Sequence, residues 1–122
     1  MSFVVPFDGS PHAEAALARA VEFGRALDEQ VTAVVVVPQR NVAYARQKGW
    51  LGDDEPFDRS TIVEGVRDQV WRVAPEVDVD DLAVDRYAPP GTIANRLKRY
   101  FESVQAAMVF VGSENAGRLV TA

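Results

Sequence analysis

The most constraining feature of the sequence is the run of residues 31–37, which reads VTAVVVV. Its residues are apolar or β-branched at odd and even positions alike, so a strand here would present such side chains on both faces of a sheet. A strand of this kind needs cover on both sides, which is typical of parallel sheets with helices on each face. The run therefore favours an α/β fold.

Strand and helix patterns alternate on either side of this run. The patterns predict strands at 3–5, 31–37, 82–87 and 108–111, and helices at 11–27, 41–48, 58–74 and 91–104. Such alternation is typical of parallel βαβ units with right-handed crossovers. We therefore expect one domain over residues 1–122, an open parallel-sheet, three-layer α/β sandwich with four strands. Residues 76–81 are interpreted as an acidic linker.

Composition excludes several classes of function. The formal net charge is −5, and the one dense basic cluster, Arg96, Lys98 and Arg99, fits a solvated helix face. Because duplex nucleic acid is bound mainly through phosphate neutralisation, we expect no nucleic-acid partner. No apolar run is long enough to span a bilayer, so no membrane partner is expected. The absence of cysteine excludes disulfides and thiolate sites and suits the cytoplasm.

Candidate ligand-binding residues follow the predicted strands. In an open parallel sheet, ligands bind beyond the carboxyl ends of the strands, where the strand order reverses. Asp8 follows the first strand, Gly91 the third, and Gly112 and Ser113 the fourth. Asp8 is either a turn carboxylate or a ligand for a ribose hydroxyl or a metal ion. Each glycine is either a plain turn residue or a point where backbone approaches a phosphate.

No pattern for catalysis is found. Neither G-x-G-x-x-G nor the P-loop motif occurs in the sequence. His12 and Ser10 lie in one helix start, whereas a catalytic triad needs convergent geometry and a third, orienting group. We therefore expect no catalytic residues. The long connection 38–57 carries Tyr44, Trp50 and Phe57, which either anchor it to the domain or form a lid over a ligand.

Two segments carry a resemblance to a known family. The sequence VPFDGS at residues 5–10 resembles the opening signature of universal stress proteins. Residues 91–113 resemble that family's second signature, in which a glycine opens a helix and an apolar strand ends in Gly-Ser; here this end reads MVFVGS. The likeness covers essentially the whole chain. It implies a parallel, adenine nucleotide alpha hydrolase-like fold and, as in many members, binding of ATP with a divalent metal.

The resemblance also implies which residues would face a nucleotide. Asp8 would lie near the ribose and would be the candidate contact to a metal such as Mg²⁺. Asn115 falls where the family's phosphate loop has its second glycine, and asparagine is the best substitute for glycine at positive φ. The expected nucleotide-binding residues are Pro6, Phe7, Asp8, Val36, Gly91, Val111, Gly112, Ser113 and Asn115.

Two departures from the family pattern shape the expected partners. The chain ends at Ala122, so the later Gly-Ser of the phosphate loop and the family's fifth strand are missing from it. We expect AMP or adenosine to bind better than ATP, since the adenosine half of the site is the better preserved. Without a fifth strand the fourth would be an open edge, which invites pairing. This predicts a homodimer, another chain covering that edge, or a chain clipped relative to its parent gene.

The leading interpretation is a cytoplasmic stress-response or signalling module that binds ATP or AMP, with Mg²⁺, and not a fast enzyme. The first alternative is a stress protein that binds no nucleotide and acts through protein contacts. A slow ATP hydrolase is the second. A receiver-type phosphoacceptor is disfavoured, because Asp8 has no acidic neighbours after the first strand.

Overall fold

The computed structural model describes residues 2–112 and the backbone of residues 119–121, and these form one sheet of five strands. The strands are β1 (Ser2–Pro6), β2 (Gln30–Pro38), β3 (Asp78–Val84), β4 (Ala106–Phe110) and β5 (Leu119–Thr121). Their order is β3-β2-β1-β4-β5, and the first four in sequence are parallel. The chain runs outward from β1 to β3 and then returns to β4 on the other side of β1. The strand order therefore reverses between β1 and β4, where ligands bind in open sheets.

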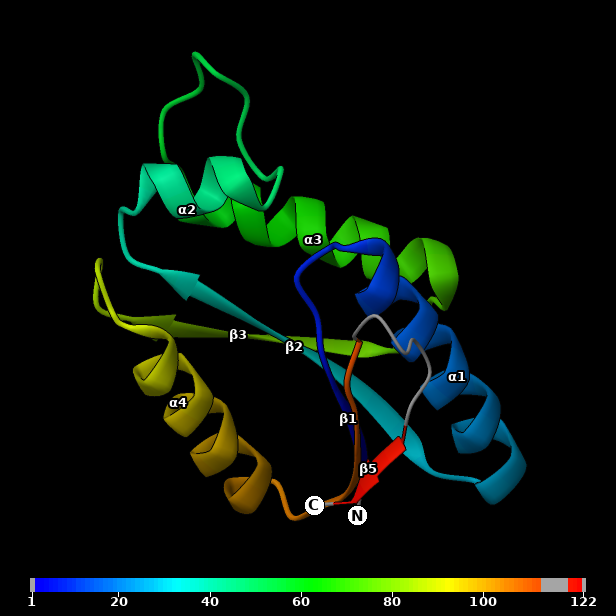
Figure 1. The fold of residues 1–122 in the computed structure, drawn as a ribbon. Coiled ribbons are helices and arrows are strands. Elements are labelled where there is room, and N and C mark those ends of the chain that lie inside the picture. The colour runs from blue at the N-terminus through cyan, green and yellow to red at the C-terminus, as the bar shows by residue number, and fades with distance from the viewer. Residues whose placement is uncertain (1, 113–118, 122) are drawn as a thin grey trace.

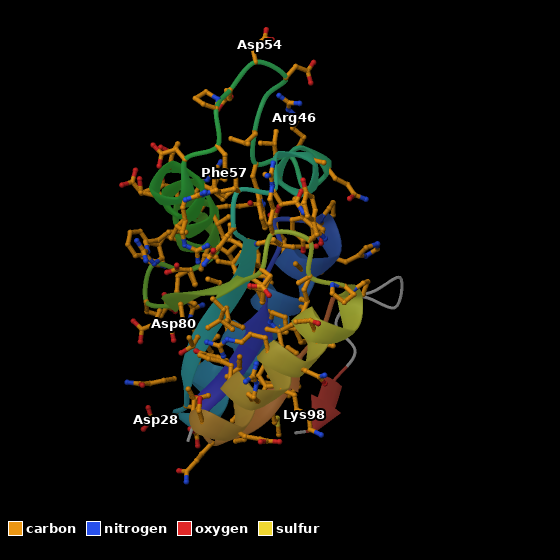
Figure 2. The ribbon with its side chains drawn as sticks, turned by 90° about the vertical axis from the view of Figure 1, so that its left-hand side faces the viewer. Asp28, Arg46, Asp54, Phe57, Asp80 and Lys98 are labelled. Atoms are coloured by element: carbon orange, nitrogen blue, oxygen red, sulfur yellow. The ribbon has the colours of Figure 1, made fainter. Side chains whose placement is uncertain are left out.

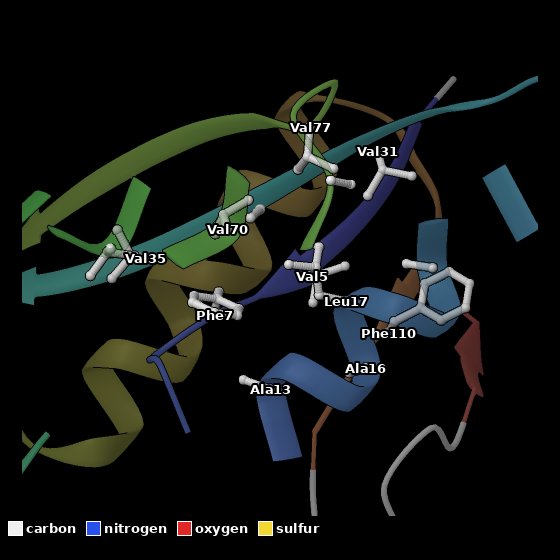
Figure 3. Packing of buried hydrophobic residues seen from close by; sticks show 14 of the residues in the cluster. Val5, Phe7, Ala13, Ala16, Leu17, Val31, Val35, Val70, Val77 and Phe110 are labelled. Atoms are coloured by element: carbon white, nitrogen blue, oxygen red, sulfur yellow. The ribbon is translucent and has the colours of Figure 1, made fainter. Parts of the chain in front are cut away.

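Helices cover both faces of the sheet, which confirms the predicted three-layer α/β architecture (Figure 1). They are α1 (Pro11–Leu27), α2 (Val42–Gln47), α3 (Arg59–Val73) and α4 (Pro90–Ser103). α1 and α3 pack on one face in a large apolar cluster, part of which Figure 3 shows. α4 packs on the other face through a smaller cluster that includes Tyr100.

The apolar run of β2 behaves as the sequence predicts. Val35 and Val37 belong to the cluster under α1 and α3, whereas Val34 and Val36 belong to the cluster under α4. Full burial of a valine side chain stabilises the fold by about 1.5–3 kcal/mol. The alternation of faces along one strand thus ties both helical layers to the centre of the sheet.

The start and end of α1 are fixed locally. The Ser10 side chain accepts a hydrogen bond from the Ala13 amide at 3.2 Å, and Pro11 occupies the first turn. At the other end Asp28 takes a left-handed conformation with φ 54°. The small residues along the buried side of α1 allow close packing, and a Cβ on Gly24 would lie 2.8 Å from Val31 Cγ2.

The third strand differs from the sequence prediction. It spans Asp78–Val84 and not 82–87, so the residues interpreted as a linker are mostly strand. β3 is an edge strand that pairs with β2 alone, and an edge tolerates exposed carboxylates. Two of these carboxylates have partners: Asp80 accepts from Tyr100 Oη at 2.6 Å, and Asp81 pairs with Arg59 at 2.9 Å.

The end of the chain also corrects an expectation. Residues 119–121 form β5, which runs antiparallel to β4 and pairs Leu119, Val120 and Thr121 with residues 110, 109 and 108. We expected no fifth strand and an open edge on the fourth strand. Both expectations are wrong, because β5 pairs with residues 108–110 of β4. Three residues suffice because β4 offers them a preformed row of backbone donors and acceptors.

The connection after β2 begins with α2, which confirms the short helix predicted near 41–48. The chain beyond it loops away from the body of the protein to Asp54 and returns at Phe57 (Figure 2). Arg46 steadies this loop by donating to the Asp53 carbonyl at 2.6 Å. Within residues 2–112 and 119–121, no helix has the length and apolar character needed to cross a membrane.

Candidate functional site

A cavity of about 210 Å³ lies at the carboxyl ends of β1 and β4, where the strand order reverses. Its lining comes from six parts of the fold: the end of β1, the end of β4, the middle of β2, the first turn of α1, the α2 segment and α4. The lining residues are Pro6, Phe7, Asp8, Ser10, Ala13, Val34, Val36, Tyr44, Lys48, Ile93, Leu97, Val111 and Gly112.

The lining of the cavity combines apolar and charged side chains. Val36 from β2 and Ile93 and Leu97 from α4 supply aliphatic surface, while Asp8 and Lys48 are the charged side chains among the described lining residues. Ligand pockets commonly combine such a hydrophobic wall with a few placed polar groups. The arrangement suits a flat, apolar ring that carries a polar extension.

Asp8 is held by two hydrogen bonds. Its Oδ1 accepts from the Ser10 amide at 3.0 Å, and its Oδ2 accepts from Lys48 Nζ at 2.9 Å. Burial by itself would raise the pKa of Asp8, but the hydrogen bonds from Ser10 and Lys48 outweigh it and lower that pKa. Asp8 therefore stays ionised, and a carboxylate with about four acceptor positions can take further donors from a ligand.

Lys48 reaches the cavity from the end of α2. Asn41 sets the position of this helix, because its side chain accepts from the Tyr44 amide at 2.9 Å and donates to the Arg86 carbonyl at 2.6 Å. The Lys48 ammonium lies 5.5 Å from the centre of the Tyr44 ring, within the range of a cation–π contact. Burial alone would lower the pKa of Lys48, but the hydrogen bond to Asp8 raises it, so the ammonium stays charged.

The turn after β1 is fastened from two sides. Trp50 Nε1 donates to the Asp8 carbonyl at 3.1 Å, and Gln69 Nε2 donates to the Gly9 carbonyl at 3.0 Å. Gly9 has φ +86°, and a Cβ there would lie 2.9 Å from Gln69 Oε1. The turn that presents Asp8 is therefore positioned by α3 and by the connection after β2.

The sequence leaves two roles open for the aromatic residues of this connection, as anchors to the domain or as a lid over a ligand. Trp50 and Phe57 make anchoring contacts. Phe57 packs against the cluster under α3, and the Trp50 ring lies 5.7 Å from the Tyr44 ring. Tyr44 does both, since it packs on Trp50 and lines the cavity. The α2 segment thus forms a wall of the cavity whose aromatic side chains tie it to the body of the protein.

Gly112 lines the cavity and lies against the first turn of α1. A Cβ on Gly112 would lie 2.5 Å from the carbonyl carbon of His12 and 2.6 Å from the Ala13 nitrogen. Real Cβ atoms do not approach backbone so closely, so this position requires glycine for packing alone. Close packing therefore explains why this residue is glycine, whether or not a ligand lies nearby.

The structure brings together most of the residues that the sequence singled out. Six of the nine line the cavity: Pro6, Phe7, Asp8, Val36, Val111 and Gly112. Gly91 does not, because it lies exposed in the first turn of α4 with open space where a Cβ would be. Ser113 and Asn115 lie outside the described residues. That these positions bind a nucleotide stays a prediction.

Sequence reasoning did not assign the remaining lining residues to the site. Ile93 and Leu97 carried a signal, since their spacing marks the apolar face of a helix. Tyr44 stood out as one of three aromatics in a long connection. Lys48 carried little signal, although it is one of only two lysines in the chain.

A protein-bound metal ion does not fit the described residues. No group of three or more histidine, aspartate or glutamate side chains within residues 2–112 comes together to hold one. Among the described residues Asp8 is the one carboxylate of the lining, and Lys48 already engages its Oδ2. A possible, indirect contact between Asp8 and a metal ion stays a prediction.

Comparison with known proteins gives a family match over almost the whole chain. The sequence model of the Universal stress protein family matches residues 1–121. No curated protein sequence matches the chain.

Solved structures match at the level of the fold. A universal stress protein in complex with cAMP has a TM-score of 0.56 and 16% identity, covering 89% of this chain and 73% of that one. A universal stress protein from Archaeoglobus fulgidus has a TM-score of 0.56 and 17% identity, covering 99% of this chain and 84% of that one. A protein of the universal stress protein family from Burkholderia pseudomallei has a TM-score of 0.52 and 22% identity, covering 93% of this chain and 82% of that one.

Proposed function

The chain belongs to the universal stress protein family, and we propose that it is a stress-response or signalling module that binds an adenine nucleotide. The observation that carries this proposal is the cavity at the strand-order reversal, whose lining combines aliphatic side chains with the Asp8 carboxylate. Binding, and not turnover, is its expected role. The cytoplasmic location predicted from the cysteine-free sequence stays a prediction.

The cavity suggests a place for each part of the ligand. The base would lie against Val36, Ile93 and Leu97, where apolar surface is available on two sides. The ribose hydroxyls would donate to Asp8, whose lowered pKa keeps it an acceptor. The phosphate end would extend toward Lys48 or toward Gly112.

The size of the cavity favours small members of the ligand class. Pockets for drug-sized ligands enclose roughly 300–1,000 Å³, whereas this cavity encloses about 210 Å³. A nucleoside or a nucleoside monophosphate is therefore favoured over a triphosphate. The structural neighbour in complex with cAMP, a nucleotide with a single phosphate, supports the same class. Magnesium is not assigned a site on the protein, because Lys48 engages the lining carboxylate.

Calorimetric titration of the protein with adenosine, AMP and ATP tests the proposal. We expect saturable one-to-one binding of AMP at micromolar to millimolar ligand, and at least tenfold weaker binding by Asp8→Ala, given the ~1.5–3 kcal/mol that hydrogen bonds to charged groups contribute. No heat with any of the three at millimolar concentration would refute nucleotide binding. Steady release of phosphate from ATP would instead support the slow hydrolase.

A second candidate function, action through protein contacts, is supported by exposed apolar side chains on α1. Phe23 is 38% exposed and Leu27 is 54% exposed, and they lie one turn apart on the same helix. The Phe23 ring also packs on Phe110 of β4, with ring centres 5.9 Å apart. The predicted homodimer would use this surface beside β4 in place of the strand edge that β5 covers.

A further inference from the structure

We propose that Lys48 determines which ligand this cavity accepts, by favouring a nucleoside with one phosphate group over both the free nucleoside and a triphosphate. The inference rests on the proposed function and adds to it the residue that recognises the anionic group. Neither of the two sequence signatures contains Lys48. The residue enters the site from α2, through the tertiary structure.

The charges of the lining favour a single phosphate. Asp8 and Lys48 are the charged side chains among the described lining residues, and they balance each other. A free nucleoside would leave the ammonium with no new partner. A phosphate monoester carries about −1.5 to −2 charge at pH 7, which the Lys48 ammonium can partly neutralise. A triphosphate would bring more negative charge to the same single cation of the described lining.

The Lys48 ammonium is held in place before any ligand arrives. The backbone N–H of Lys48 donates to the Tyr44 carbonyl at 3.0 Å, which closes the last turn of α2. Gly49 then turns the chain with φ +77°, and the side chain of the next residue, Trp50, donates to the Asp8 carbonyl at 3.1 Å. A flexible lysine loses side-chain freedom when it binds an anion, and this arrangement has already removed part of that freedom.

One ammonium can serve Asp8 and a phosphate together. An ammonium has three N–H donors, and Nζ of Lys48 directs one of them to Asp8 Oδ2. The other two can donate to phosphate oxygens without breaking that hydrogen bond. Asp8 meanwhile keeps acceptor positions beyond those used by Ser10 and Lys48, so it can still hold ribose hydroxyls.

The second lysine of the chain offers a matched control. Lys98 is exposed on α4, where it lines a surface groove with Thr92 and Glu102. It lies at the opposite end of the protein from Arg46 and Asp54, which mark the α2 segment and its loop (Figure 2). Removing its charge changes the net charge of the protein as much as removing that of Lys48 does, but leaves the cavity unaltered.

Calorimetric titrations with adenosine, AMP and ATP should be made on the wild type, Lys48→Met, Lys48→Arg and Lys98→Met. In the wild type we expect AMP to bind at least about tenfold more tightly than adenosine, the lower limit for hydrogen bonds to a charged group. ATP should bind no better than AMP. The preference for AMP over adenosine should vanish in Lys48→Met, return in part in Lys48→Arg and persist in Lys98→Met.

A chemical measurement on the wild type avoids any loss of folding in the variants. Lysine acetylation can be followed by mass spectrometry, with Lys98 as the internal reference. AMP should protect Lys48 more than adenosine does, and neither should protect Lys98. If adenosine and AMP bind equally tightly, or if Lys48→Met keeps the preference for AMP, the role of Lys48 is refuted while nucleoside binding stands. If none of the three ligands binds, both proposals fail.

Discussion

Gly112, just after β4, lies directly against the backbone of His12 in the first turn of α1, and a Cβ on Gly112 would come within 2.5 Å of the His12 carbonyl carbon. This contact closes one side of the cavity and joins the two turns that follow β1 and β4. The neighbour is backbone of a helix and not the end of a flexible side chain. It therefore cannot move aside at low cost.

Gly112→Ala should lower the free energy of unfolding by about 1–3 kcal/mol, the usual cost of overpacking. Chemical denaturation of the purified variant measures this. Gly91→Ala is the matched control, since a Cβ at Gly91 meets nothing within 4 Å in the first turn of α4. There alanine should be neutral or stabilise the protein by up to about 1 kcal/mol. Equal stabilities of the two variants would contradict the close packing of Gly112.

The Asp8–Lys48 pair should make stability depend on pH at the acid end. The folded protein lowers the pKa of Asp8 below its ordinary value of 3.8. Asp8 therefore contributes stability above the pKa of the unfolded chain, and this is lost as the pH falls through the lower pKa of the folded state. Because the Asp8 side chain is 36% exposed, solvent screening limits the effect to under about 1 kcal/mol.

Asp8→Asn isolates this contribution, because it keeps the size of the side chain and removes its charge. Its unfolding free energy should fall less steeply than that of the wild type below pH 4, and the two curves should run parallel near pH 7. Urea denaturation at several pH values between 2 and 4 measures this. If the unfolding free energy of the variant and of the wild type changes equally with pH, Asp8 has no lowered pKa in the folded state.

Trp50→Phe should weaken AMP binding as well as folding. It removes the hydrogen bond to the Asp8 carbonyl, which is worth about 0.5–1.5 kcal/mol, and frees the segment that carries Lys48. Trp71→Phe is the control: Trp71 Nε1 also donates to a backbone carbonyl, that of Val77, and neither residue lines the cavity. Titration calorimetry should detect weaker binding in the first variant only. Weaker binding in both would point to global destabilisation.

Leu27→Glu tests whether the exposed apolar surface of α1 mediates contact between copies of the chain. Leu27 is 54% exposed, so the substitution should change the stability of the isolated chain by less than about 0.5 kcal/mol. Sedimentation velocity should show that a concentration-dependent dimer of the wild type shifts to monomer in the variant. A wild type that stays monomeric at high micromolar concentration would argue against self-association.

The layers of the fold could be predicted from local patterns. The apolar run 31–37 requires cover on both faces, and Ser10 with Pro11 starts α1 as capping chemistry dictates. Those signals act between near neighbours in the chain, so the sequence alone carries them. It also placed Asp8 and Gly112 at strand ends that converge on one cavity.

Other features depend on contacts between distant segments. The acidic stretch 78–81 has little strand character by itself and becomes β3 because β2 offers it an edge to pair with. Likewise β5 exists by pairing with β4. Lys48 is 40 residues from Asp8 in the sequence, and their pairing follows from how α2 folds back over the end of β1. The sequence determined the central strands of the sheet, its two layers of helices and the end where a ligand would bind, because local patterning sets these. Tertiary structure decided which charge faces that ligand, because only packing brings Lys48 to Asp8.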